Sequence, residues 1–286
     1  MHTSCVKIIL SVLCVVMTLL FPLNAAPAGP MIFAVHPYLP ATEIIEKFGP
    51  LARYLSKELG RQVIIDISLD YQNHIERTGR DNIDIAYMGP ASYVKMVGEY
   101  GRKTILARQA INGKPTFQGV IIVRKESPLH ALKDLAGKRF AFGDPESTMS
   151  HLVPRYMLLK GGVTIDRLGG HAFLENHHNV ALGVLAGDFH AGAVKEEVFD
   201  AYDERGLREL ARTPYIPDHV FVATKRVSAE EGRNVRDALY LLMKNEEGRK
   251  ILDAVKTSMG LVPGEDSDYD DLREMLLALE RAGAYK

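Results

Sequence analysis

The sequence predicts an α/β protein of two lobes, each a mostly parallel sheet flanked by helices. Short apolar stretches of strand-like composition alternate with amphipathic, helix-like stretches, which is typical of a parallel sheet covered by helices. The alternation comes in two batches, over residues 30–115 and 125–210. Extended segments at 117–124 and 209–224 lie between them. We therefore expect the chain to leave the first lobe through one segment and return through the other.

Apolar periodicity and stop residues define the elements of the first batch. The strand that opens it ends at His36-Pro37, and the first helix carries its apolar residues on one face and stops at Gly60. The expected elements are a strand at 31–35, a helix at 44–59, a strand at 63–67, a short helix at 71–77, a strand at 83–88 and a helix at 91–100.

The second batch and the C-terminal part follow the same logic. A capping box at 227–231, with an apolar residue before the cap, opens the first of three C-terminal helices. The expected elements are strands at 117–124, 140–142, 189–194, 207–211 and 220–223, and helices at 129–135, 152–160, 180–185, 227–243, 247–255 and 269–279.

One stretch, residues 140–150, has the composition of an anion site. A short apolar strand ends at Gly143, a turn follows, and three hydroxyl residues precede a helix: Ser147, Thr148 and Ser150. The first turn of a helix has free backbone N–H groups and a partial positive charge, and hydroxyls add donors. A plain helix cap by one of these hydroxyls would explain the same pattern.

Composition limits the classes of partner and chemistry. The 286 residues carry a formal net charge of −1, which argues against nucleic acid, since that partner favours a basic face. Residues 1–28 resemble a secretory leader, with Lys7 before an apolar run and small residues after it; an uncleaved membrane anchor is the alternative. Both cysteines, Cys5 and Cys14, lie in this leader, so the mature protein is expected to need neither a disulfide nor a thiol nucleophile.

An ordered series of short motifs covers nearly all of the mature chain. They are NIDIAYMGP at 82–90, GVIIVR at 119–124, SPL at 127–129, DLAGK at 134–138, DPEST at 144–148, LVP at 152–154 and the His177-His178 segment leading to Gly187. The series resembles the phosphate-, phosphite- and phosphonate-binding proteins of bacterial ABC importers, a branch of the periplasmic binding proteins of type II fold. The resemblance implies a first lobe from residues 29–116 plus 221–286, and a second lobe, with the hinge segments, from 117–220.

The resemblance also implies a ligand site between the lobes. Ser147 and Thr148, with the amides at that helix start, would bind the oxygens of the anion. Tyr71 would reach in from the first lobe, and His177 would donate from the second. Glu197 lies where binders of aminoalkylphosphonates place an acid for the ammonium group of the ligand.

Three positions depart from the family pattern. Met149 stands where the family usually has Ser, Phe117 stands where a Tyr is expected, and His219 stands at the second acidic contact, with Asp218 beside it. A His can donate to an oxyanion but does not attract an amine. We therefore predict a compact oxyanion or a phosphonate without an amine. The predicted ligand-binding residues are Tyr71, Phe117, Ser147, Thr148, Ser150, His177, Glu197, Asp218 and His219.

The predicted function is that of a monomeric, exported periplasmic binding protein that delivers its ligand to an ABC permease. It would need no cofactor, no metal and no catalysis, and it would bind no nucleic acid. One alternative is a sensor that presents the closed state to a membrane histidine kinase. Another is a metal-binding protein that uses the histidines at positions 151, 171, 177, 178 and 190. An enzyme is disfavoured because the sequence has no Gly-x-Ser-x-Gly, glycine-rich nucleotide loop or His-Glu-x-x-His motif.

Overall fold

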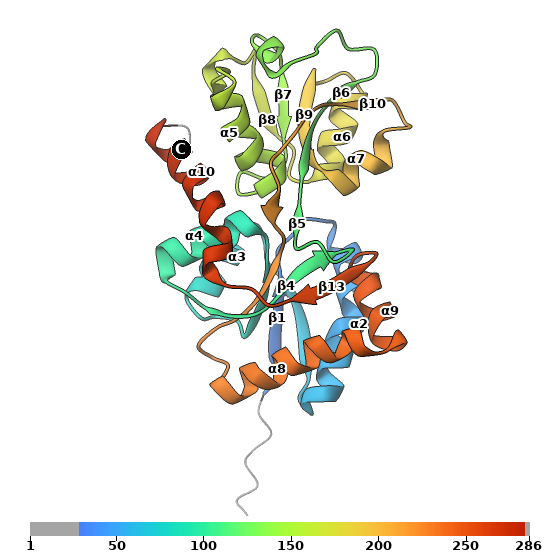
Figure 1. The fold of residues 1–286 in the computed structure, drawn as a ribbon, viewed down its shortest axis with the longest axis vertical. Coiled ribbons are helices and arrows are strands. Elements are labelled where there is room, and N and C mark those ends of the chain that lie inside the picture. Colours follow the sequence, from blue (N-terminus) through green and yellow to red (C-terminus); the bar gives the residue numbers. More distant parts are fainter. Residues whose placement is uncertain (1–28, 284–286) are drawn as a thin grey trace, which may run out of the picture.

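The computed structural model describes residues 29–283, and within them the chain folds into two lobes (Figure 1). Each lobe is built on one sheet, and the two sheets share no strand. No helix of this described part is long and apolar enough to cross a membrane. The predicted leader, residues 1–28, lies outside the described residues.

The lower sheet in Figure 1 has six strands, and β1 lies inside it, parallel to β2 on one side and β3 on the other. Phe33 and Ala34 point to opposite faces of β1 and both are fully buried, because helices cover both faces of the sheet. β12 pairs antiparallel with β3 and β4. In spatial order the strands are β13 (Met259–Val262), β4 (Thr104–Ile111), β12 (Val220–Ala223), β3 (Ile85–Met88), β1 (Met31–Val35) and β2 (Val63–Ile67).

The upper sheet has five strands, of which β7 runs parallel to β8 and β9. β6 pairs antiparallel with β9 and β10, and its residues 120–123 are fully buried, as their continuous apolar run predicts. In spatial order the strands are β10 (Leu207–Arg212), β6 (Gly119–Arg124), β9 (Ala191–Lys195), β7 (Phe140–Phe142) and β8 (His171–Phe173).

Two chain segments connect the lobes, and they pair with each other. β5 (Thr116–Phe117) lies on the outgoing segment and β11 (Ile216–Pro217) on the returning one, with Phe117 opposite Ile216 in an antiparallel ribbon. The two-lobed arrangement with two crossing segments is the one predicted from the sequence. The lobe boundaries at residues 116 and 220 stay a prediction.

Helices cover both sheets. A π-helical turn, η3 (Thr148–Leu152), runs directly into α5, and 3-10 turns lie at Leu132–Leu135, Ile165–Arg167, Leu242–Lys244 and Asp266–Tyr269. The helices are α2 (Ala41–Leu59), α3 (Tyr71–Gly79), α4 (Pro90–Tyr100), α5 (Val153–Lys160), α6 (His177–Leu185), α7 (Glu196–Tyr202), α8 (Ala229–Leu241), α9 (Glu246–Val255) and α10 (Asp270–Arg281).

Helix α2 illustrates how the sequence pattern sets an element. Its buried residues recur with helical spacing and include Ile44, Phe48 and Leu55, which are at most 1% exposed. Gly60 ends the helix in the left-handed conformation, with φ 59°, which a residue with a side chain adopts at a cost. The predicted stop of α2 at Gly60 is therefore confirmed. The predicted capping box at the start of α8 is confirmed as well, because the Ser228 hydroxyl accepts a hydrogen bond from the Glu231 N–H.

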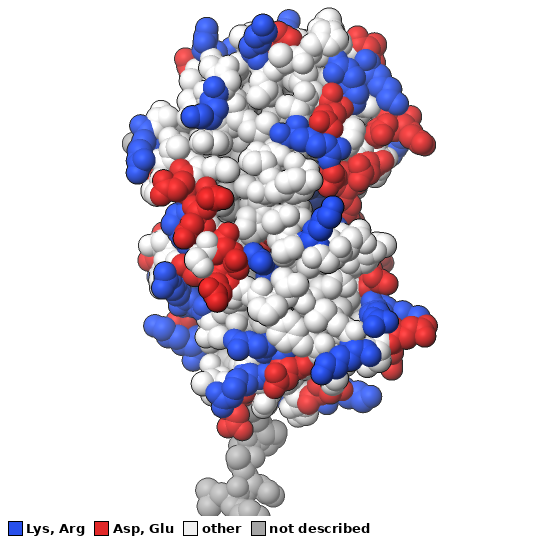
Figure 2. Space-filling view, in the orientation of Figure 1, with Lys and Arg blue, Asp and Glu red and all other residues white. Residues whose placement is uncertain are grey.

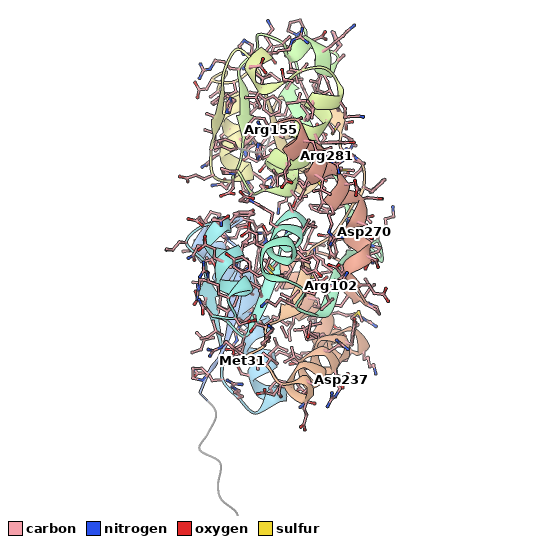
Figure 3. All side chains as sticks on the ribbon, turned by 90° about the vertical axis from the view of Figure 1, so that its left-hand side faces the viewer. Met31, Arg102, Arg155, Asp237, Asp270 and Arg281 are labelled. Atoms are coloured by element: carbon pink, nitrogen blue, oxygen red, sulfur yellow. The ribbon has the colours of Figure 1, made fainter. Side chains whose placement is uncertain are left out.

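A second core crosses from one lobe to the other. Leu152 and Val153 of the upper lobe share a cluster of buried residues with Ala91 of α4 and with Leu276 of α10. Figure 3 shows α10 rising from Asp270, beside the lower lobe, to Arg281, close to the upper lobe. The C-terminal helix therefore packs against both lobes, whereas the sequence analysis places it in the first lobe alone.

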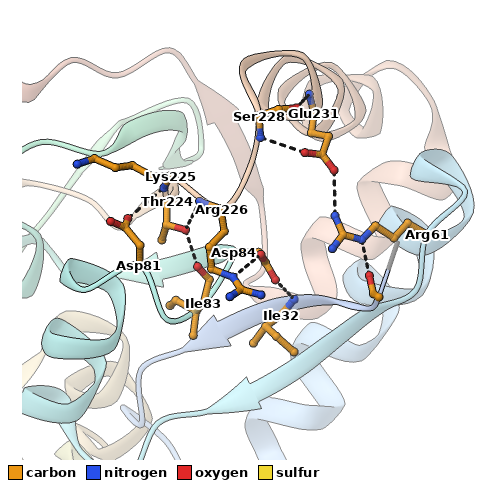
Figure 4. A network of polar contacts seen from close by, with 11 residues as sticks. Ile32, Arg61, Asp81, Ile83, Asp84, Thr224, Lys225, Arg226, Ser228 and Glu231 are labelled. Atoms are coloured by element: carbon orange, nitrogen blue, oxygen red, sulfur yellow. Dashed lines mark hydrogen bonds and ion pairs between the residues drawn. The ribbon is translucent and has the colours of Figure 1, made fainter. Parts of the chain in front are cut away.

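A network of polar contacts ties the returning chain to the lower sheet (Figure 4). The buried carboxylate of Asp84 accepts hydrogen bonds from the Ile32 N–H at 2.7 Å and from the Arg226 guanidinium at 2.9 Å. Nearby, Glu231 accepts from the guanidinium of Arg61 at 2.9 Å. These contacts join the start of β1 to the connection between β12 and α8, so the first strand of the lower lobe is tied to the chain that returns from the upper lobe.

Four strands of the described chain were absent from the sequence prediction: β4, β8, β11 and β13. β4 carries Arg108 and Gln109 among its apolar residues, and β13 contains Gly260, so neither shows a clear strand composition. β8 is three residues long and begins at His171. Pairing with segments distant in the chain, which a single sequence does not display, makes these segments strands.

We expect Gly192→Ala to destabilise the upper lobe. A Cβ at this position in β9 would lie 2.6 Å from Cγ1 of Val180 and 3.0 Å from Cγ2 of Val184, both on α6. Overpacking of this kind costs about 1–3 kcal/mol, which urea unfolding would measure as a lower midpoint. The control is Gly98→Ala on the exposed face of α4, where a Cβ meets nothing within 4 Å and stability should rise by about 0.5–1 kcal/mol. Equal stability of the two variants would contradict this packing.

Candidate functional site

A small cavity lies where the two lobes meet. Its volume, counted as the space open to the centre of a water-sized sphere, is about 20 Å³. Most of its wall residues follow the carboxyl ends of parallel strands, where ligand sites in such sheets occur. The wall consists of His36, Tyr38, Tyr71, Gly89, Phe117, Ser147, Thr148, Met149, His177, Lys195 and His219.

Four helices of the described chain begin at this cavity. Tyr71 is the first residue of α3, Gly89 precedes α4, Ser147 precedes the turn η3 that leads into α5, and His177 is the first residue of α6. Helix N-termini carry unpaired N–H groups and a partial positive charge. Two come from each lobe, so the closed cavity is surrounded by positive helix ends.

The hydroxyl-rich loop contributes its side chains unequally. The Ser147 hydroxyl accepts a hydrogen bond from the Ser150 N–H at 3.3 Å and also faces the cavity. The Thr148 hydroxyl accepts from the Ala91 N–H of the other lobe at 3.0 Å, which leaves its own O–H to donate. Ser150 is buried but does not line the cavity. Its Oγ packs on Gly143 so closely that a Cβ added to Gly143 would lie 2.1 Å from this oxygen.

His177, and not its neighbour, lines the cavity. Its Nδ1 accepts a hydrogen bond from the Lys195 N–H at 3.0 Å, so the proton of the neutral ring sits on Nε2. Burial lowers the pKa of His177 well below the ordinary value, which favours the neutral ring. The ring of His178 instead lies beside Tyr202, with Nδ1 3.4 Å from the phenol oxygen.

His219 and Asp218 act as a pair. The fully buried Asp218 does not reach the cavity wall; its Oδ1 accepts from Nδ1 of His219 at 2.8 Å and from the N–H of the same residue. Burial lowers the pKa of His219, and Asp218 partly opposes that shift. The pair therefore presents Nε2 of His219 near the cavity, 3.8 Å from where a Cβ of Gly89 would lie.

Of the remaining predicted residues, two line the cavity and one lies outside it. Tyr71 is buried at the wall, where its ring meets His36 edge-on at 5.0 Å, and burial raises its pKa. Phe117 lies at the wall on the crossing strand β5. Glu197 stands outside this cavity, with its Oε2 3.2 Å from Nζ of Lys195 and 3.3 Å from Nζ of Lys256.

Five wall residues are absent from the predicted ligand-binding set: His36, Tyr38, Gly89, Met149 and Lys195. Both ring nitrogens of His36 are buried and have no hydrogen-bond partner among the described residues, and burial lowers the pKa of this ring well below its ordinary value. The ring stacks on Tyr38 with centroids 4.9 Å apart. A signal was available, since His36 directly follows β1 and Lys195 ends β9, both at carboxyl ends of parallel strands.

Two other kinds of site would have a clear signature in the described residues: a cluster of metal-binding side chains and a continuous basic face for nucleic acid. Within residues 29–283 no group of three or more His, Cys, Asp or Glu side chains is placed to hold a metal ion. Basic and acidic side chains are intermixed over the face seen in Figure 2, in contrast to the continuous basic face that nucleic acid requires. The interlobe cavity is therefore the candidate site.

Known proteins similar to this chain include a phosphate-import protein and a phosphonates-binding protein. A family model described as the periplasmic phosphonate substrate-binding protein of ABC transporters matches residues 33–269. The chain is 28% identical over 261 residues to the phosphate-import protein PhnD of Mycolicibacterium smegmatis, covering 82% of this chain and 81% of the relative. It is 25% identical over 251 residues to the phosphonates-binding periplasmic protein of Escherichia coli, covering 83% and 73% respectively.

A solved structure shares the fold. PhnD1 from Prochlorococcus marinus, in complex with methylphosphonate, matches with a TM-score of 0.79 at 23% identity, covering 88% of this chain and 99% of that chain. The predicted fold class, a two-lobed α/β protein of the type II periplasmic binding kind, is confirmed.

Proposed function

The chain belongs to the family of periplasmic substrate-binding proteins of phosphonate ABC transporters, and from this premise we propose that it captures a compact phosphorus oxyanion between its lobes. The ligand class is phosphate, phosphite or a phosphonate with a small uncharged substituent. The protein hands this ligand to a membrane permease and performs no chemistry on it. Hinge closure of the two lobes around the ligand is the mechanism.

One observation carries the proposal: helix N-termini from both lobes and the unpartnered ring of His36 converge on one small cavity between the lobes. A sphere of the observed 20 Å³, enlarged by a water radius of about 1.4 Å, is about 6 Å wide, which is the width of a tetrahedral oxyanion. Backbone N–H groups at helix starts bind such anions without further charge.

The side chains have separate roles in this proposal. Ser147, Thr148 and Tyr71 donate hydroxyl hydrogens to the ligand oxygens, and Nε2–H of His177 donates from the upper lobe. His36 is the remaining donor, because either tautomer of its ring carries one N–H that otherwise has no partner among the described residues.

His219 adapts to the protonation state of the ligand. While neutral, it gives its Nδ1–H to Asp218 and keeps Nε2 as an acceptor for a P–OH group. A dianion in the cavity favours the imidazolium, whose Nε2–H then donates to P–O⁻, and Asp218 stabilises that charge.

Three finer points belong to the same proposal. The leader at residues 1–28 is cleaved on export, the mature protein acts in the periplasm, and it is a monomer. Neither alternative function, the kinase sensor nor the metal carrier, is favoured by a contact within residues 29–283.

Calorimetry on the purified protein tests the ligand class. We expect tight, saturable binding of phosphate, phosphite or methylphosphonate, and much weaker binding of sulfate and of 2-aminoethylphosphonate. Absence of heat with all three phosphorus anions, from protein first unfolded and refolded to remove a retained ligand, would refute the proposal.

Two matched variants of the hydroxyl loop test the placement of the ligand. Thr148→Val should lower the affinity for the tightest ligand about 10–100-fold, since a hydrogen bond to a charged group contributes about 1.5–3 kcal/mol. Ser150→Ala should leave the affinity within about twofold, because its Oγ packs on Gly143 outside the wall. The reverse ranking would place the anion on the other side of the loop.

His36→Phe separates binding from stability. The ring keeps its stacking on Tyr38, but the two unpaired nitrogens disappear, so the empty protein should be as stable as the parent or more stable. The affinity should fall about tenfold or more, because one donor to the ligand is lost. Thermal unfolding without ligand and calorimetry with it measure the two effects. Loss of stability with unchanged affinity would assign His36 to the core.

A further inference from the structure

A second small cavity lies beside the first. It also measures about 20 Å³ and shares the walls formed by Tyr38, Phe117, Lys195 and His219. Any substituent on the central atom of a ligand held at the first cavity must pass those shared side chains or stay small. The second cavity therefore decides which substituents the binding site accepts.

Glu197 is the only acid in the walls of the two cavities, among the described residues. Its Oε2 is 3.2 Å from the ammonium of Lys195 and 3.3 Å from that of Lys256. Partial burial opposes ionisation, yet these two ammonium groups lower the pKa of Glu197 to about 2. The one carboxylate that could receive a ligand cation is thus ionised and already paired twice.

Lys195 is fixed in this position. Its side chain is 9% exposed, and Nζ lies 4.8 Å from the centroid of the Tyr38 ring, as in a cation–π contact. Its backbone N–H holds the ring of His177. The ammonium therefore stands at the boundary between the two cavities, on a strand end that packing holds rigidly.

We propose that Lys195 is the specificity determinant of the site: its ammonium occupies the place that a ligand ammonium would need and so excludes aminoalkylphosphonates. This inference rests on the proposed function and narrows its ligand class. Two like charges brought to about 4 Å in a partly dry cleft correspond to a loss of affinity of about 100-fold or more.

The test is the ratio of affinities for methylphosphonate and 2-aminoethylphosphonate, measured by calorimetry. The parent protein should prefer methylphosphonate by about 100-fold or more. Lys195→Met keeps the length of the side chain, removes the charge and leaves Glu197 with Lys256 alone, so the preference should fall at least about tenfold. In the double variant K195M/E197Q most of the preference for methylphosphonate should be restored, because the carboxylate that attracts the ligand ammonium is then absent.

Lys250→Met is the matched control, since its ammonium pairs with Glu246 on the exposed face of α9. It should leave the preference unchanged. Glu197→Gln gives an independent readout if K195M does not fold. The E197Q variant should bind 2-aminoethylphosphonate no more weakly than the parent does. A tenfold fall with E197Q would show that the acid already holds a ligand amine, and it would overturn the inference.

The outcomes separate the two proposals. A parent protein that binds methylphosphonate, with a preference that K195M leaves unchanged, overturns the role of Lys195 and retains the function. A parent that binds none of the phosphorus anions overturns the function and this inference with it.

Discussion

The structure buries positive helix ends and hydrogen-bond donors around one cavity, and among residues 29–283 no acid lies in the wall of that cavity. The two N-termini from each lobe face one another, and the carboxylate of Asp218 reaches the cavity only through His219. Such groups lose water when the lobes meet, and an unpaired buried donor is costly. An oxyanion supplies acceptors on every side at once. In the proposed function, ligand binding and closure would therefore be coupled, because the anion would bind the closed arrangement better than the open one.

Direct contacts between the lobes lie beside the cavity and oppose that cost in part. The Ala91 N–H donates to the Thr148 hydroxyl, the Lys95 ammonium lies 2.6 Å from the Glu146 carboxylate, and α10 packs against α5 next to the shared core. These contacts hold the two lobes together beside the cavity. The Thr148 hydroxyl accepts the hydrogen bond between the lobes with its oxygen, and in the proposed function its O–H would donate to the ligand.

The fold was largely readable from the sequence, and the site only in part. Apolar runs and caps are local signals, so β1, α2 and the capping box at Ser228 lie where predicted. Ser147 and Thr148 were predicted from a hydroxyl-rich turn between a strand and a helix, His177 only from the resemblance to the family, and all three line the cavity. His36 and Lys195 lie about 160 positions apart, and only the packed lobes bring them together. The Ser150 side chain lies in a π-helical turn, and no local sequence pattern predicted that turn.

Selectivity in such a site has to come from side chains and not from the anion cradle. Helix N-termini offer N–H groups and partial charge to any tetrahedral anion, so they confer affinity without telling one substituent from another. The groups that differ between ligands must meet the walls beyond the anion. In this chain those walls combine the end of β9, the crossing strand β5 and the residue after α9. These walls come from both lobes and from the crossing segment, and the helix starts around the first cavity also come from both lobes. Under the proposed function, a ligand therefore meets the anion-binding groups and the selectivity-determining side chains in the same closed arrangement.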